Sequence, residues 1–127
     1  MRTSVINKVA EIAALYKQGF DDAVVLEADL LVQQLIIALC EHAGCSIEIA
    51  ENERSQERAV LTTRLSVQGI HLGENVHNLR RLRNELEHPE SKSEAAVENA
   101  QTRAAAKTAI SAVNEVITLV NAVGFNN

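Results

Sequence analysis

A long apolar stretch after the acidic pair Asp21-Asp22 is the strongest constraint on how this chain folds. From Val24 to Leu39 most positions are apolar, so a helix over this stretch has no broad polar face. Such a helix belongs in the middle of a helical bundle or at a subunit interface. Its polar residues fall on two narrow lines, which we expect to be solvent-facing edges. These lines are Glu27-Gln34-Glu41 and Asp29-Gln33.

The rest of the chain also favours a few long helices, because it contains one proline and five glycines. We expect four helices and a loop over residues 45–54. The helices are predicted from Thr3 or Ser4 to Gly19, from Asp21 to Ala43, from Ser55 to Pro89 with a kink or break at Gly69 and Gly73, and from a Ser91-x-x-Glu94 capping box to about Val123. The sequence therefore predicts a single all-α domain over residues 1–127, an antiparallel four-helix bundle.

A basic segment lies at the end of the predicted third helix. Arg80, Arg81 and Arg83 fall within four positions, in a chain whose net charge is −5. Spacing around a helix places Arg83 on the apolar face and Arg81 on the opposite side. A guanidinium on a core-facing arc is costly unless it is paired or lines a cleft. Arg83 therefore either pairs with an acid such as Glu27 or Asp29, or belongs to a functional site.

The residues that follow Arg83 favour a functional site. Pro89 ends the helix, so that His88 is free to turn back toward Arg83. An imidazole can remove the proton of an RNA 2′-hydroxyl or protonate the leaving 5′-oxygen, and a guanidinium can stabilise charge on the phosphoryl oxygens. Asn84 can orient His88 or bond a phosphate oxygen. We expect Arg80 and Arg81 to contact RNA or phosphate, and we expect neither a metal nor a cofactor.

The string Arg83-Asn84-Glu85-Leu86-Glu87-His88 resembles the R-x4–6-H signature of the HEPN family. This family comprises all-α domains, many of them metal-independent endoribonucleases of toxin–antitoxin, phage-defence and RNA-processing systems. The resemblance implies Arg83, Asn84 and His88 as catalytic residues, and a homodimer in which both motifs line one cleft. It also implies an antitoxin or another regulatory protein as a partner. One branch carries a Tyr two positions after the His; here Glu90 stands there, so control by modification of that Tyr is not implied.

Two other functions fit the same sequence. One is a non-catalytic HEPN-like module that binds a nucleotide or a partner protein through Arg83, and the other is a plain helical oligomerisation domain. The acidic total argues against nucleic-acid binding over the whole surface but permits a local basic cleft. Cys40 and Cys45 lack metal-site spacing. The N-terminus lacks a signal-peptide core, and the apolar run Leu30–Cys40 is too short for a bilayer, so we expect a cytoplasmic protein.

Overall fold

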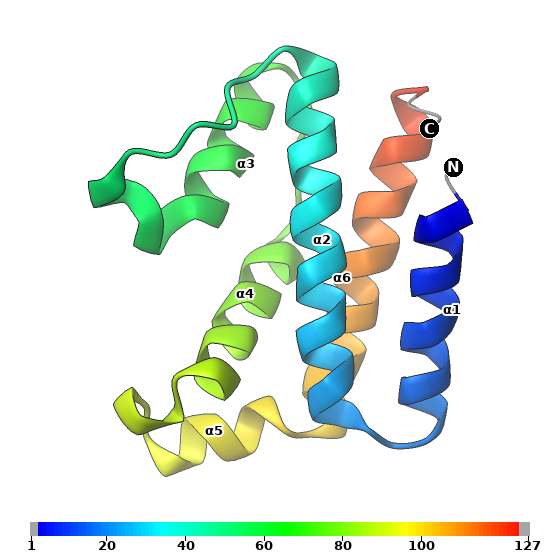
Figure 1. The fold of residues 1–127 in the computed structure, drawn as a ribbon, viewed down its shortest axis with the longest axis vertical. Helices are drawn as coiled ribbons and strands as arrows, with labels where there is room; N and C mark the ends of the chain where they lie inside the picture. The colour runs from blue at the N-terminus through cyan, green and yellow to red at the C-terminus, as the bar shows by residue number, and fades with distance from the viewer. Residues whose placement is uncertain (1–2, 125–127) are drawn as a thin grey trace.

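All regular secondary structure in the computed structural model, which describes residues 3–124, is helical (Figure 1). The α-helices are α1 (Thr3–Lys17), α2 (Asp21–Ala43), α3 (Glu57–Val67), α4 (Glu74–Glu87), α5 (Glu94–Ala100) and α6 (Arg103–Ala122), and the 3-10 helices are η1 (Glu51–Gln56) and η2 (Pro89–Ser91). The prediction of an all-α chain is confirmed. The segment 45–50 is irregular and leads into η1, as the predicted loop requires.

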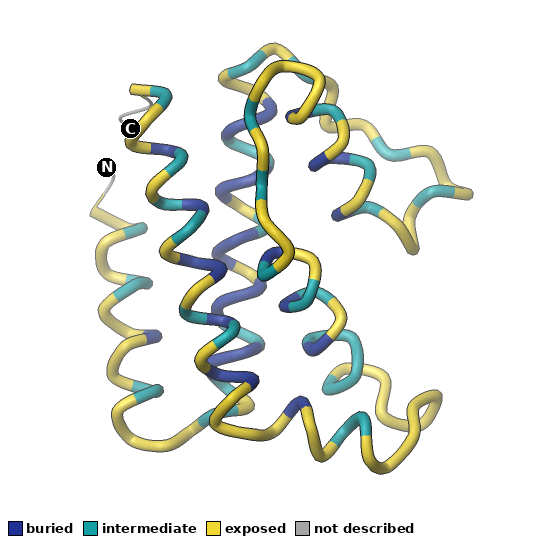
Figure 2. Tube along the Cα trace, turned by 180° about the vertical axis from the view of Figure 1, so that it is seen from behind, coloured by how far each residue is buried: buried dark blue, intermediate teal, exposed yellow. Residues whose placement is uncertain are grey.

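Helix α2 occupies the centre of the molecule. It contacts α1, α3, α4 and α6, and Figure 2 shows its buried side facing the buried side of α6. Four alanines of α6, which packs against α2 and α4, are buried, and their small side chains allow neighbouring helices to approach closely. The buried alanines are Ala105, Ala106, Ala109 and Ala112. The apolar stretch of α2 is therefore a core helix, as its sequence predicts.

Taken as a whole, α2 is long and apolar enough to span a membrane. The sequence analysis considered only the run Leu30–Cys40, which is too short to do so. Core helices of soluble proteins meet the same criteria, and ten residues of α2 are buried inside this fold. The length and composition of α2 are therefore weak evidence for a span.

Glycine and proline set the helix ends that the sequence predicts. Gly44 has a left-handed backbone with φ of 78°, and the amide of Cys45 donates to the carbonyl of Cys40, which closes the end of α2. Gly69, with φ of 83°, lies in the turn between α3 and α4, and of the predicted kink or break the structure has a full break. Pro89 follows α4, which ends at Glu87.

The predicted final helix is wrong in two details. Ser91 does not cap it; the Oγ of Ser93 accepts a hydrogen bond from the amide of Ala96, and α5 begins at Glu94. A break then follows Ala100, because the Oγ1 of Thr102 caps a new helix by accepting from the amide of Ala105. α5 and α6 are therefore separate helices, and α5 crosses below the end of α4 (Figure 1).

Removal of the cap on α6 should destabilise the protein. Thr102→Ala leaves the amide of Ala105 without its side-chain acceptor, so the free energy of unfolding should fall by about 1 kcal/mol in urea denaturation. Thr118→Ala, at an exposed position inside α6, is the matched control and should be neutral or slightly stabilising. Equal stability of the two variants would contradict the capping role.

Candidate functional site

The carboxylate of Asp29 lies buried at the centre of an arginine cluster, formed by Arg58, Arg80 and Arg83. Its side chain in α2 is only 4% exposed. Arg58 Nη1 lies 3.0 Å from Asp29 Oδ1, Arg80 Nη2 lies 3.1 Å from Oδ2, and Arg83 Nε lies 3.9 Å from Oδ2. The expectation that the Asp29-Gln33 line faces solvent is therefore wrong for Asp29, because arginines from α3 and α4 cover it.

Gln33, one turn after Asp29, adds hydrogen bonds to the same cluster. Its Oε1 accepts from Arg58 Nη2 at 2.9 Å and from Arg80 Nη2 at 3.0 Å. Its Nε2 donates to the carboxylate of Glu57. A single turn of α2 thus fixes side chains of both α3 and α4.

Arg58 is the most deeply buried cation of the cluster, and the sequence analysis did not identify it. Its side chain is 3% exposed, and its Nη1 donates to the carbonyl of Val76 at 3.0 Å. Burial, with a smaller contribution from repulsion by Arg80, lowers its pKa to about 10 in spite of the attraction of Asp29, so Arg58 remains charged at neutral pH. The signal for its burial was present, because Arg58, Leu61 and Leu65 share one face of α3.

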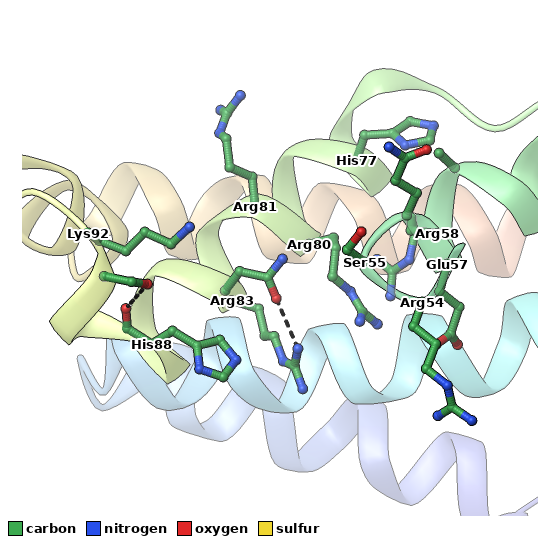
Figure 3. A pocket seen from close by; sticks show the side chains of 14 residues that line it. Arg54, Ser55, Glu57, Arg58, His77, Arg80, Arg81, Arg83, His88 and Lys92 are labelled. Carbon is green, nitrogen blue, oxygen red and sulfur yellow. Dashed lines mark hydrogen bonds between the residues drawn. The ribbon is translucent and has the colours of Figure 1, made fainter. Parts of the chain in front are cut away.

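The cluster forms part of a basic cleft of about 560 Å³ between the start of α3 and α4 (Figure 3). Among residues 3–124, its walls carry six cations and a single carboxylate, that of Glu57. The cations are Arg54, Arg58, Arg80, Arg81, Arg83 and Lys92, half of the chain's 12 basic residues. Asn84, His77 and His88 also line this cleft. All five residues that the sequence analysis selected, Arg80, Arg81, Arg83, Asn84 and His88, thus lie along one cavity.

Arg83 is only half-buried, with 29% of its side chain exposed. The guanidinium enclosed in the core is that of Arg58, so the prediction that Arg83 is the core-facing charge needs this correction. Arg83 Nη1 donates to Asn84 Oδ1 at 2.9 Å, and Nη2 lies 3.7 Å from the carboxylate of Glu87. Of the two acids proposed as its partner, Asp29 is near Arg83, whereas Glu27 pairs with Lys8 at 2.8 Å. Arg83 is therefore the member of the cluster with the weakest hold on Asp29.

His88 has left the helix, as the proline predicts. Its φ and ψ are −129° and 54°, its amide donates to the carbonyl of Asn84, and its imidazole is exposed. The ring lies 4.0 Å from the carboxylate of Glu90. In Figure 3 the side chains of His88 and Arg83 lie on the same side of α4. Within residues 3–124 no hydrogen bond joins His88 to Arg83, and Asn84 bonds Arg83 rather than the imidazole.

Arg80 and Arg81 differ in how they border the cleft. Arg80 is held by Asp29 and Gln33, and its buried Nε has no hydrogen-bond partner in the described part of the chain. Arg81 is exposed and extends away from Arg80 and Arg83 (Figure 3). Arg80 is thus a fixed charge in the wall of the cleft, and Arg81 is a free charge at its edge.

His77 lines the cleft but was not selected from the sequence. It is exposed in the first turn of α4. His77, Arg81 and Asn84 recur at intervals of four and three residues, which is one face of a helix. This polar face of α4 is the signal that could have identified His77.

No other protein helps to assign the cleft, since no family model, curated protein or solved structure matches this chain. Residues 3–124 also contain no group of three or more His, Cys, Asp or Glu residues that could hold a metal ion. The geometry and charge of the cleft are therefore the features that indicate its function.

The burial of Asp29 leads to a stability prediction. Asp29→Asn removes the charge that faces buried Arg58, and an uncompensated buried charge costs about 3–5 kcal/mol of folding free energy. Glu27→Gln, which removes a partly exposed carboxylate paired with Lys8, should cost at most about 1 kcal/mol. Urea denaturation followed by circular dichroism measures both. Equal losses for the two variants would contradict the central role of Asp29.

Proposed function

We propose that this protein is a metal-independent endoribonuclease of the HEPN type, with α1, α2, α4 and α6 as the four helices of an antiparallel bundle. The observation that carries the proposal is the shared cleft of Arg83, Asn84 and His88, whose walls hold six cations in a chain of net charge −5. A cleft of this charge attracts a polyanion, whereas the net negative charge of the rest of the protein repels it.

The proposed reaction is transesterification within the RNA strand. His88 accepts the proton of a 2′-hydroxyl, whose oxygen then forms a bond to the adjacent phosphorus. The bond from phosphorus to the 5′-oxygen breaks, and that oxygen takes up a proton. The products are a 2′,3′-cyclic phosphate and a 5′-hydroxyl. Arg83 stabilises the negative charge that builds up on the phosphoryl oxygens, and its half-exposed fork allows two parallel hydrogen bonds.

The reaction needs both a proton acceptor and a proton donor. Each chain has one histidine beside Arg83, namely His88, whereas His77 lies near the opposite end of α4. A homodimer that brings two copies of the cleft together would supply a second imidazole for the leaving oxygen. The proposed active form is therefore a dimer.

A binding module without catalysis is the second candidate, and one observation favours it. Arg83 and Arg80 are already engaged by Asp29, the imidazole of His88 lies 4.0 Å from the carboxylate of Glu90, and no hydrogen bond within residues 3–124 orients the ring toward Arg83. In that function the arginines bind a phosphate group of a nucleotide or RNA, and His88 has no role.

Cleavage of RNA in EDTA separates the two candidates. Wild-type protein should cut single-stranded RNA in the presence of EDTA, and His88→Ala should reduce the rate by about 10²–10⁴-fold through loss of proton transfer. His71→Ala is the matched control, because His71 is exposed, bonds Ser66 and lies outside the cleft. Its rate should equal that of wild type.

Two results would overturn the proposal. One is wild-type protein that binds RNA and leaves it intact, which favours the binding module. The other is His88→Ala protein that cuts RNA at the wild-type rate.

A further inference from the structure

The basic cleft extends well beyond the Arg83–His88 motif. His88 and Lys92 line one end of it, whereas Arg54 and His77 line the other (Figure 3). His77 in α4 and His88, the first residue after α4, are eleven residues apart in the sequence. At 1.5 Å per residue, that separation is about 16 Å along the helix axis. The distant end is therefore too far from the reacting phosphate to contact it.

The distant end carries charge that the fold does not use. The side chain of Arg54 is exposed and makes neither an ion pair nor a hydrogen bond in the part of the chain that the structure describes. Arg80, which stands between Arg54 and the motif, is held by Asp29 and Gln33, and its Nε is buried. Among the lining residues that the structure describes, Glu57 is the single carboxylate, and Gln33 donates a hydrogen bond to it. The end of the cleft near α3 thus keeps the guanidinium of Arg54 available for a ligand.

We propose that Arg54 and His77 form a second phosphate subsite, which binds the RNA strand several nucleotides from the scissile bond. This inference rests on the proposed function for the identity of the ligand. A stacked strand rises about 3.4 Å per nucleotide, so about 16 Å corresponds to roughly five nucleotides, or fewer in an extended strand. The substrate is therefore a single-stranded oligonucleotide rather than a mononucleotide.

The lining also indicates how the strand is recognised. Within residues 3–124 no Phe, Tyr or Trp lines the cleft, so bases lack there the aromatic platforms that usually hold them in single-strand binding grooves. Contacts through arginine and lysine fall on the phosphates, which carry no sequence information. Binding through this subsite should accordingly be tolerant of sequence and strongly weakened by salt.

Oligonucleotide binding to His88→Ala protein tests the subsite without turnover. Fluorescently labelled oligouridylates of two, four, six and eight nucleotides serve as probes, together with an RNA duplex of the longest length. Affinity should rise with length up to about five nucleotides and then level off. The duplex should bind more weakly than the single strand of equal length.

Loss of charge at the distant end should remove the gain from length. Arg54→Gln in the His88→Ala background should weaken binding of the octamer roughly fivefold and reduce its salt slope by about 0.7, and His77→Gln should act in the same direction. Lys107→Gln removes the same charge from an exposed position of α6 outside the cleft, and should change neither quantity.

The outcomes separate this inference from the proposed function. Three results would overturn the subsite. They are an affinity that does not depend on oligonucleotide length, a duplex that binds as tightly as the single strand, and equal effects of Arg54→Gln and Lys107→Gln on binding. Length-dependent binding that Arg54→Gln abolishes supports it, even where wild-type protein fails to cut RNA. In that case the ribonuclease proposal fails and the strand-binding subsite stands.

Discussion

The buried carboxylate of Asp29 is the interaction on which this structure depends. It lies in the central helix α2 and faces guanidinium groups from α3 and α4, so that one charge helps to hold three helices together. Burial of a single ion pair contributes little net stability, but removal of one partner is costly. The cluster around Asp29 also has a surplus of positive charge, because one carboxylate faces three arginines. That surplus makes the adjoining cleft basic in a protein of net negative charge.

The arginines divide between structure and chemistry according to their burial. Arg58 is enclosed and bonded to a backbone carbonyl and to Gln33, so it serves the fold. Arg83 is half-exposed and 3.9 Å from Asp29, so a phosphate group could replace Asp29 as its partner at little cost in free energy. Arg80 stands between these extremes, paired with Asp29 and yet lining the cleft. The same carboxylate thus fixes the orientation of the inner arginines and leaves the outer one available.

Features that depend on neighbouring residues could be predicted from the sequence, and features that depend on distant ones could not. Gly44, Gly69 and Pro89 end helices through local backbone geometry, and each acts where it was expected to. Thr102 is also a local signal, since it caps α6. The alanines before and after it favour a continuous helix, however, and so the break between α5 and α6 was not predicted. The burial of Asp29 could not be foreseen, because its partner Arg58 lies 29 residues away and reaches it only through packing of α3.

The chemical identity of the cleaved ends tests the central claim most directly. RNA incubated with wild-type protein in EDTA should yield fragments with 2′,3′-cyclic phosphate and 5′-hydroxyl ends, and a 2′-deoxy substitution at a cut site should block cleavage there. These results follow from attack by the 2′-oxygen, with the Arg83–His88 cleft as the site of reaction. Fragments with 3′-hydroxyl and 5′-phosphate ends, or continued cleavage at the deoxy position, would contradict the account.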